Sequence, residues 1–213
     1  MTIWDTIYKN YQGGGIAWAS IKEGLHPDFV VFVEHASFEI KNALDIGCGN
    51  GKYLLFLQQL GFQVTGLDSS LTAISMAKEA VKNPAHFIVA DMFVYSSPPN
   101  AYDLVISHAA LHRGLKSKVI SSVAKIHSTL LAGGNIFLSL PNEDCKKNWV
   151  MMAGHETLAD GTCIPIQGPE KGLPHSFFSS QEIKALFADE YDDLTIKLDD
   201  HGRWIITGQK KRA

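Results

Sequence analysis

The sequence is poor in cysteine and has no long apolar run. Its three cysteines, Cys48, Cys145 and Cys163, form no C-x-x-C pair, so neither a disulfide framework nor a zinc ribbon is indicated. No apolar run approaches the roughly 18–20 residues that a membrane-spanning helix needs. The first residues lack the basic and apolar regions of a secretory signal. We therefore expect a cytoplasmic protein without a membrane partner.

An excess of charge of one sign is also absent. The 19 Lys and Arg residues and the 22 Asp and Glu residues leave a formal net charge of −3. An extended nucleic-acid surface usually needs a basic excess, so we expect no nucleic-acid partner. Hydrophobic residues make up 46% of the 213 positions, which excludes disorder as the main state. This length predicts a single domain over residues 1–213.

Short apolar runs alternate with helical patterns from residue 41 onward. The runs predict strands at residues 43–46, 63–67, 87–90, 104–106 and 136–140. Of the helical patterns between them, one begins after Ser69 or Ser70, either of which is expected to cap it, and a later one is closed by Gly133-Gly134. Such an alternation implies parallel strands with right-handed crossovers, that is, a doubly wound α/β sheet.

The two ends of the chain follow other patterns. Residues 1–38 predict two helices joined across Gly13–Gly15. Residues 141–178 form a long irregular stretch, too long for a simple connector. Residues 179–213 predict a helix with a capping box and a closing β-hairpin at 194–207. The predicted sheet therefore has seven strands, mostly parallel with a C-terminal antiparallel hairpin strand.

The turn after the first predicted strand is rich in glycine. It runs Asp45-Ile46-Gly47-Cys48-Gly49-Asn50-Gly51 and leads into a helix. Glycine permits positive φ and lets a ligand approach the backbone, and a helix N-terminus directs free N–H groups outward. The turn therefore predicts a site for a nucleotide or another ligand with anionic groups; the alternative is a tight turn with no ligand.

Two related glycine motifs do not fit this turn. The phosphate-binding P-loop requires G-x-x-x-x-G-K-[ST], but Ile46 precedes the glycines and Tyr53 follows Lys52. The dinucleotide fingerprint G-x-G-x-x-G would need a third glycine at position 52, which is lysine. The spacing here is G-x-G-x-G, with an acid two residues before the first glycine.

Acidic residues stand where the first three predicted strands end, at Asp45, Asp68 and Asp91. Open α/β sheets bind their ligands at the carboxyl ends of parallel strands. A carboxylate at position 68 can accept strong hydrogen bonds from ribose hydroxyls. The alternative for Asp68 is a helix N-terminal acid that serves only Ser69 and the helix dipole.

These residues resemble the class I S-adenosylmethionine-dependent methyltransferases over about residues 40–140. The most specific part is Asp45-x-Gly47-x-Gly49-x-Gly51 together with Asp68 and Asp91. The resemblance implies S-adenosylmethionine as cofactor, with the glycine loop under its methionine part. The cofactor-binding residues that it implies are Tyr11, Trp18, Asp45, Gly47, Cys48, Gly49, Gly51, Asp68, Ser69, Asp91, Met92, Ser107 and His108.

The resemblance also implies individual roles. Asp45 would lie near the amino group of the cofactor, Asp68 would hold the ribose hydroxyls, and Asp91 with Met92 would meet the adenine. Ser107 or His108 would lie beside the methionine moiety and the substrate. In these terms, residues 1–38 are a helical lid, 39–140 the cofactor-binding core, 141–178 a substrate cover, and 179–213 the closing helix and hairpin.

The lid and the cover carry further expectations. Tyr11 or Trp18 is the aromatic residue expected to contact the cofactor, and the alternative is ordinary helix packing. The stretch from Trp149 to Phe178 is expected to cover the acceptor, because methionine and aromatic side chains suit an apolar pocket. Cys48 is assigned to packing near the cofactor, although a helix start can lower a thiol pKa.

The acceptor and the chemistry are less constrained by the sequence. Ser107-His108-Ala109-Ala110 follows the fourth strand in place of the Asp/Asn-Pro-Pro-Tyr motif of adenine and glutamine methyltransferases. The cytosine-type Pro-Cys nucleophile is missing as well, so we expect a small-molecule acceptor. His108 is the candidate catalytic base, with His112, an exposed or merely hydrogen-bonded residue, and His155 or His175 as alternatives, and no metal site is predicted.

The favoured interpretation is thus a methyltransferase that is a monomer or a weak homodimer. Two alternatives remain open at this stage. One is a non-catalytic S-adenosylmethionine-binding protein that activates a partner. The other is an NAD(P)-dependent oxidoreductase, which the glycine spacing and Asp45 disfavour.

Overall fold

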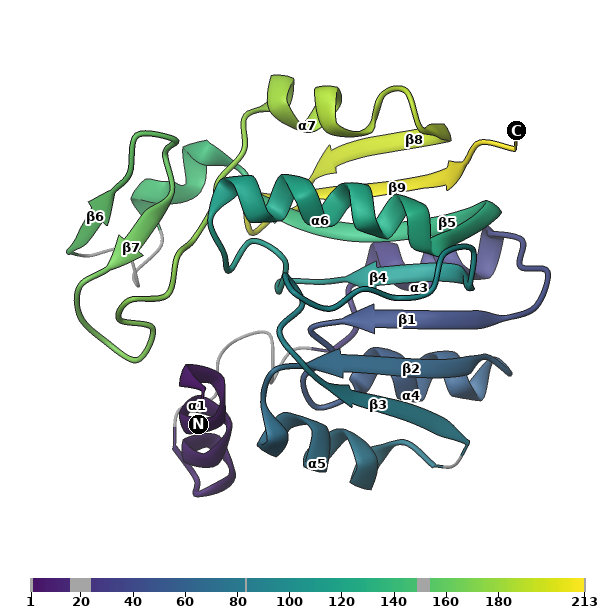
Figure 1. Cartoon of the computed structure of the whole chain (residues 1–213), viewed down its shortest axis with the longest axis horizontal. Helices are drawn as coiled ribbons and strands as arrows, with labels where there is room; N and C mark the ends of the chain where they lie inside the picture. The colour runs from purple at the N-terminus through teal and green to yellow at the C-terminus, as the bar shows by residue number, and fades with distance from the viewer. Residues whose placement is uncertain (1, 16–23, 83, 149–153, 213) are drawn as a thin grey trace.

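The protein is built on one seven-stranded sheet (Figure 1). The computed structural model describes residues 2–15, 24–82, 84–148 and 154–212. The strand order is β3-β2-β1-β4-β5-β9-β8. The strands are β1 (Asn42–Ile46), β2 (Gln63–Asp68), β3 (Ala85–Val89), β4 (Tyr102–Ser107), β5 (Leu130–Pro141), β8 (Tyr191–Leu198) and β9 (Arg203–Lys210).

The direction of the strands confirms the predicted fold class. β1 to β5 pair in parallel, whereas β9 is antiparallel to both β5 and β8. The strand order reverses at β1, which lies between β2 and β4. Open α/β sheets bind ligands outside the carboxyl ends of their strands at such a switch point.

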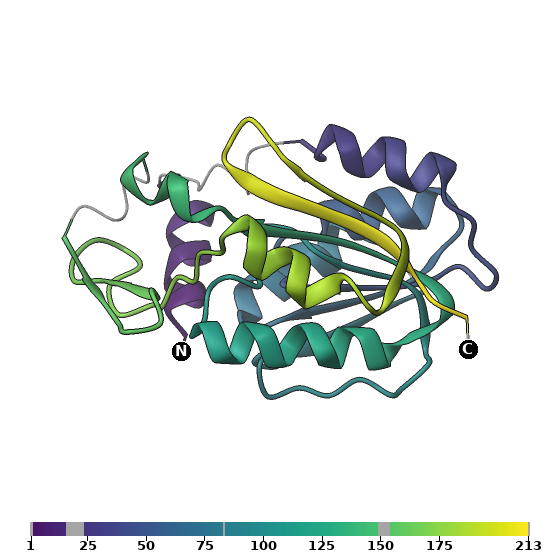
Figure 2. The same cartoon turned by 90° about the horizontal axis from the view of Figure 1, so that it is seen from above.

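Helices cover both faces of the sheet (Figure 2). One layer consists of α3 (Pro27–His35), α4 (Lys52–Gln59) and α5 (Leu71–Ala80), and the other of α6 (Lys116–Thr129) and α7 (Ser180–Phe187). Alternate strand residues serve the two layers: Ala43 of β1 packs with the first and Leu44 with the second. Both side chains are fully buried, so the sheet has a core on each side.

Two elements lie at the carboxyl edge of the parallel strands (Figure 1). One is α1 (Ile3–Gln12), and the other is the hairpin of β6 (His155–Thr157) and β7 (Cys163–Pro165), which follows a 3₁₀ helix at Glu143–Asn148. The stretch predicted to be irregular, 141–178, is therefore partly ordered. This hairpin was not predicted, because strands of only three residues carry little signal in a sequence.

Helix α1 is fastened to the core through Asp5. Its carboxylate completes a capping box with Thr2 at the start of α1. The same carboxylate accepts hydrogen bonds from the Ser70 hydroxyl at 2.9 Å and from the Thr72 amide at 3.3 Å, at the start of α5. Ser70 is the N-cap of α5, as one of the two predicted alternatives. Asp5 therefore joins the N-termini of two helices.

The glycine pair Gly133-Gly134 does not close the preceding helix, contrary to the prediction. α6 ends at Thr129 and β5 begins at Leu130 with no loop between them. Gly133 lies inside β5 with a φ of 77°, and a Cβ at Gly134 would be 3.1 Å from the Tyr102 carbonyl oxygen. The glycines allow β5 to pass close to β4 near the shifted register at Tyr102.

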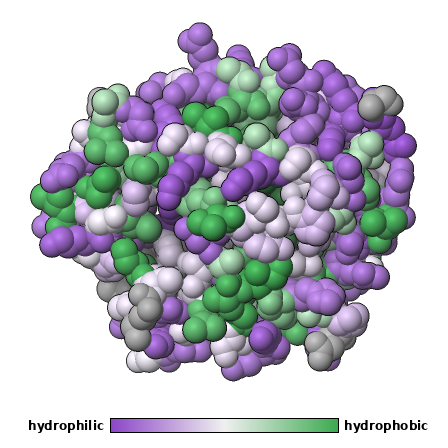
Figure 3. All heavy atoms as spheres, viewed as in Figure 1, coloured by the Kyte–Doolittle hydropathy of each residue, from purple (hydrophilic) through white to green (hydrophobic). Residues whose placement is uncertain are grey.

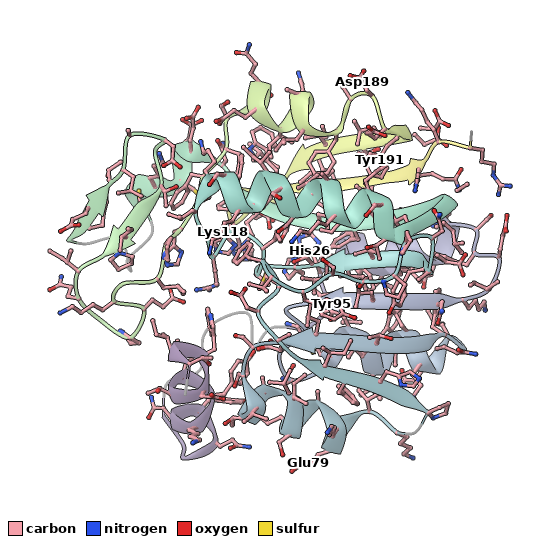
Figure 4. The ribbon with its side chains drawn as sticks, in the orientation of Figure 1. His26, Glu79, Tyr95, Lys118, Asp189 and Tyr191 are labelled. Carbon is pink, nitrogen blue, oxygen red and sulfur yellow. The ribbon has the colours of Figure 1, made fainter. Side chains whose placement is uncertain are left out.

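The connection from β3 to β4 contains no helix, although all of residues 90–101 are described. Val89 at the end of β3 and Val94 in the connection are 45% and 74% exposed. On the face drawn in Figure 3, hydrophobic residues gather in a patch below the centre of the view. Tyr95 of this connection lies over the sheet (Figure 4). Within the described ranges, no helix is both long and apolar enough to cross a membrane.

Candidate functional site

A pocket of about 680 Å³ opens at the carboxyl edge of the sheet, beneath α1. This volume is typical of a small-molecule or cofactor site. The ends of β1, β2 and β4 contribute to its lining. The described residues that line it are Trp4, Tyr8, Asp45, Gly47, Cys48, Gly49, Asn50, Lys52, Tyr53, Asp68, Ser69, Met92, His108, Ala109, Ala110 and Arg113.

Most of the residues implied by the resemblance meet in this pocket. They are Asp45, Gly47, Cys48, Gly49, Asp68, Ser69, Met92 and His108. They come from four separate stretches of the chain. The parallel pairing of β1 with β2 and β4 in the sheet brings these stretches together. The contacts of these residues with a cofactor stay a prediction.

Four of the implied residues do not line the pocket. Tyr11 packs beside Tyr8 and Ala73. Gly51 is the N-cap of α4. Asp91 is exposed and accepts a hydrogen bond from the Phe93 amide, and Ser107 is buried and donates to the Ile46 carbonyl. Trp18 and Trp149 lie outside the described residues.

Several lining residues had no place in the prediction. Trp4 and Tyr8, one helical turn apart on α1, line the pocket where Tyr11 was expected to. The spacing of four residues was a usable signal, because it places both rings on one face of the helix. Arg113, just after the predicted His112, was missed as well. No local sequence pattern indicates that an arginine will be buried.

Four backbone amides of the glycine turn are already hydrogen-bonded within the chain. The amides of Gly47 and Cys48 donate to the Leu67 carbonyl at 2.7 and 3.0 Å. The Gly49 amide donates to Asp68 at 3.0 Å, and the Gly51 amide donates to the Cys48 carbonyl. The expectation of a ligand with anionic groups at this turn stays a prediction. The turn uses its N–H groups to hold β1 against β2.

The glycines of the turn are required by the surrounding chain. Gly47 and Gly49 have φ values of 78° and 55°. A Cβ at Gly47 would lie 2.3 Å from the Ala110 side chain, and one at Gly49 would lie 2.5 Å from the Tyr8 hydroxyl. These two glycines let α1 and the segment after β4 close around the pocket.

Asp45 is a buried carboxylate with an unused oxygen. The residue is only 2% exposed, and its Oδ2 has no hydrogen-bond partner among the described residues. Burial raises the pKa of Asp45 to about 7, and the nearby Asp68 adds to this increase while Lys52 opposes it. A cationic donor in the pocket would satisfy the free oxygen and favour the ionised carboxylate.

Asp68 is held in place by the backbone. Its Oδ1 accepts from the Ser70 amide at 2.9 Å and its Oδ2 from the Gly49 amide at 3.0 Å. Burial raises the pKa of Asp68, although these hydrogen bonds act in the opposite direction. Each carboxylate oxygen can accept more than one hydrogen bond, so the fixed carboxylate can still accept from a ligand.

Cys48 also lines the pocket, but as a thiol. Burial strongly raises its pKa, with Asp45 and Asp68 adding to the effect. A neutral, buried thiol is a poor nucleophile. The effect of the helix start on this thiol is thus outweighed, and the packing role expected from the sequence agrees with its burial.

His108 is paired with an arginine from β9. Arg203 Nη1 lies 3.3 Å from Nε2 of His108. Because a guanidinium can only donate, Nε2 is the unprotonated nitrogen and Nδ1 carries the proton. Burial lowers the pKa of His108 well below its usual value, and Arg203 adds to this decrease. His108 is therefore neutral and offers an N–H donor, so as a base it would first have to lose Arg203.

The other predicted histidines lie elsewhere. Of the two roles expected for His112, exposed or merely hydrogen-bonded, the first is wrong, because the residue is buried. Its ring centroid is 5.8 Å from that of His175. His108 and His112 are not on one helical face, because the chain between them forms bends and turns. His155 is exposed on β6.

A buried ion pair closes one side of the pocket. Arg113 pairs with Glu170, and the second oxygen of Glu170 lies 3.0 Å from Nε2 of His175. The guanidinium carbon of Arg113 lies 4.4 Å from the centroid of the Trp4 ring. Glu170 has a lowered pKa: burial would raise it, but Arg113 and His175 together outweigh the effect of burial. The pair links α1 to the segment that follows β7.

The strand order and the acidic edge pocket together define a Rossmann-like methyltransferase fold. Residues 43–134 match the family described as a methyltransferase domain. This match agrees with the resemblance to the class I S-adenosylmethionine-dependent methyltransferases in the sequence, and the fold is that of these enzymes.

The relatives agree on the fold. A SAM-dependent methyltransferase from Methanosarcina mazei is 24% identical, with a TM-score of 0.67 over 90% of this chain and 100% of that chain. A protein from Pyrococcus horikoshii OT3 reaches a TM-score of 0.76 at 16% identity, over 99% of this chain and 100% of that one.

A curated relative is similar over part of its length. The ubiquinone biosynthesis O-methyltransferase of Burkholderia vietnamiensis is 32% identical over 130 residues. This match covers 59% of the present chain and 55% of the relative. The chain therefore spans about half the length of the curated relative that it matches.

Proposed function

We propose that this chain transfers a methyl group from S-adenosylmethionine to a small-molecule acceptor. The observation that carries the proposal is the free Oδ2 of buried Asp45, beside Asp68, in a pocket whose loop amides are already used. Two buried carboxylates beside a loop whose glycine amides are already hydrogen-bonded suit a positively charged group better than a phosphate. S-Adenosylmethionine carries an ammonium and a sulfonium group.

The lining residues fit the parts of this cofactor. Asp45 accepts from its ammonium group, and Asp68 accepts from its ribose hydroxyls while the backbone holds the carboxylate in place. Met92 lies against the adenine, and Trp4 with Tyr8 covers the pocket from α1. Asp91 reaches the adenine only if the connection after β3 shifts, since its side chain is exposed here.

The reaction requires little from the protein beyond orientation. The bound cofactor supplies a methyl group on a sulfonium, ready for in-line displacement by a nucleophile. Holding two reactants in line is worth roughly 7–11 kcal/mol. Residues 39–140 hold the cofactor, α1 in residues 1–38 forms the lid, and residues 141–178 contribute to the acceptor side. The curated relative is named an O-methyltransferase, which supports an oxygen acceptor.

The alternatives have less support. A dinucleotide would bring a pyrophosphate to a turn whose amides are occupied and whose neighbours are carboxylates. A non-catalytic cofactor-binding protein would share the cofactor pocket, so only product formation separates it from an enzyme.

The first test is a parallel calorimetric titration with S-adenosylmethionine, S-adenosylhomocysteine and NADH. The proposal expects micromolar binding of the first two and no binding of NADH. Binding of NADH alone would contradict it. A screen of hydroxyl compounds for S-adenosylhomocysteine release then tests catalysis, and a cofactor-binding chain that releases none with any acceptor would support the non-catalytic alternative.

A further inference from the structure

A second cavity lies at the same edge of the sheet, on the other side of His108. It encloses about 940 Å³. Its walls are the segment before α3, at residues 24–28, and the turn of the C-terminal hairpin, at residues 197–201. His108 lines both this cavity and the cofactor pocket. The two spaces are therefore neighbours that share one side chain.

Asp199 lines this cavity with an acidic side chain. Its side chain is only 3% exposed. Oδ1 accepts from the His201 and Arg203 amides at 2.9 and 2.7 Å, which fixes the hairpin turn. Oδ2 has no hydrogen-bond partner among the described residues. One oxygen of Asp199 is thus structural, and the other is left for something in the cavity.

His26, labelled in Figure 4, orients this carboxylate. Its Nδ1 accepts from the Asp28 amide at the start of α3, so the proton is on Nε2. Nε2 lies 3.5 Å from Oδ2 of Asp199. The ring centroids of His26 and His108 are 5.4 Å apart. His26 therefore stands between the acid and the histidine that the two cavities share.

His108 supplies the complementary group. Arg203 occupies its Nε2, which leaves Nδ1–H as a donor, and this nitrogen is buried without a hydrogen-bond partner in the described part of the chain. The cavity therefore combines an unused acceptor, Asp199 Oδ2, with an unused donor, His108 Nδ1–H. A hydroxyl group can satisfy both, because it donates one hydrogen bond and accepts others.

We propose that this second cavity is the methyl-acceptor site, that it takes a neutral compound through a hydroxyl group, and that Asp199 is the general base. This assignment rests on the proposed methyltransferase function. Three carboxylates line the cavity against one lysine, Lys197, which already pairs with Asp28 at 2.8 Å. An acidic acceptor would therefore be repelled.

The proton transfer follows from this placement. The acceptor hydroxyl donates to Oδ2 of Asp199, while His108 Nδ1–H holds its oxygen toward the shared wall. As the new C–O bond forms, the C–S bond of the sulfonium breaks and its electron pair stays on sulfur. The hydroxyl proton moves to Asp199 and then to solvent, and S-adenosylhomocysteine is the second product. A positioned base contributes roughly 10²–10⁴-fold to such a step.

The test measures binding without turnover. Saturation-transfer NMR with the full chain and S-adenosylhomocysteine gives dissociation constants for phenol, catechol, benzyl alcohol and cyclohexanol, with benzoate as the anionic comparison. We expect at least one hydroxyl probe to bind and benzoate not to bind. Failure of all four hydroxyl probes to bind the wild-type chain overturns the proposal.

Two variants locate the binding. Asp199→Asn keeps an oxygen for the turn amides. It should lower the affinity for the bound probe at least about tenfold, the loss expected for a charged hydrogen bond. Leu198→Trp fills the cavity from a half-exposed position and should abolish probe binding. Asp192→Asn, exposed on the same hairpin, is the matched control. Unchanged probe binding in both cavity variants contradicts the assignment.

Calorimetry separates this proposal from the proposed function. S-Adenosylhomocysteine should bind the wild-type chain and Asp199→Asn with the same affinity. If it binds neither, the methyltransferase proposal fails whatever the NMR result. If it binds both, and the dissociation constant of the hydroxyl probe is the same in the two cavity variants as in the wild-type chain, only the acceptor-site assignment fails.

Discussion

The guanidinium of Arg113 lies against the indole face of Trp4, 4.4 Å from the ring centroid. Arg113 follows β4, and Trp4 belongs to α1, so this contact fixes the lid helix over the pocket. A buried cation–π contact is worth about 0.5–2 kcal/mol.

Removing this contact should weaken cofactor binding. Trp4→Ala is expected to lower the affinity for S-adenosylhomocysteine about tenfold in calorimetry. Tyr11→Ala, two helical turns along α1 and outside the pocket lining, is the matched comparison. A larger loss in Tyr11→Ala than in Trp4→Ala would show that the lid closes in another orientation.

The raised pKa of Asp45, about 7, makes the stability of the free protein depend on pH. Folding favours the protonated carboxyl, because the pKa in the unfolded chain is near the ordinary 3.8. Stability is thus lost as pH rises from about 4 to 7. In denaturant unfolding at pH 8, the free energy of unfolding of Asp45→Asn should therefore exceed that of the wild-type chain by roughly 1–4 kcal/mol. At pH 4 the two free energies should be equal.

The same carboxyl should couple binding to proton release. A ligand ammonium favours the ionised form, so binding at pH 6.5 should release part of a proton. Calorimetric titration in two buffers of different ionisation enthalpy measures this release. Asp45→Asn should abolish it and bind more weakly, despite being the more stable protein. Equal proton release in the variant would exclude Asp45 as its source.

Asp68 and Asp91 should differ in their effect on cofactor affinity. Asp68→Asn keeps the shape of a carboxylate that accepts from two amides, yet loses the charge. We expect this variant to bind S-adenosylhomocysteine about tenfold or more weakly than the wild-type chain. Asp91→Asn, which can retain the hydrogen bond from the Phe93 amide, should change affinity less than threefold unless the loop after β3 moves on binding. Thermal unfolding of both variants controls for loss of structure.

The ion pair between Arg113 and Glu170 should matter mainly for stability. Both side chains are at least 90% buried, and Glu170→Gln would leave the arginine without its counter-charge. We expect a loss of about 3–5 kcal/mol in the free energy of unfolding. Glu39→Gln, in an exposed pair with Arg212, should change it by less than about 1 kcal/mol. Comparable losses in the two variants would contradict the importance of burial.

Much of the fold could be predicted because its signals are local. The β-rich segment of α3 was still recognisable as a helix, since Pro27 stands at its first turn, and Phe29 and Val33 are its buried residues. The capping box at Ser179 likewise marked the start of α7. The three strand-end acids were identified by position alone, although only Asp45 and Asp68 line the pocket.

The rest of the site depends on pairs that are distant in sequence. Arg113 meets Glu170 across 57 positions, and Arg203 reaches His108 across 95. No periodicity or motif in one sequence predicts such a pairing, because the pairing depends on how distant segments are arranged in the folded chain. The same applies to the glycine turn, because the acceptors of its amides include Leu67 and Asp68 on the neighbouring strand β2.

The helix-free connection between β3 and β4 has a consequence for the order of folding. It is held by later residues: Lys125 donates to the Phe93 carbonyl at 2.9 Å, and Lys118 (Figure 4) lies 6.0 Å from the Phe93 ring centroid. Both lysines belong to α6. Within the connection, the Phe93, Val94 and Tyr95 amides form one short turn on Asp91. A single turn gains little stability until its partner is in place. We therefore expect the segment after β3, which lines the pocket through Met92, to become ordered during synthesis only after α6 has left the ribosome.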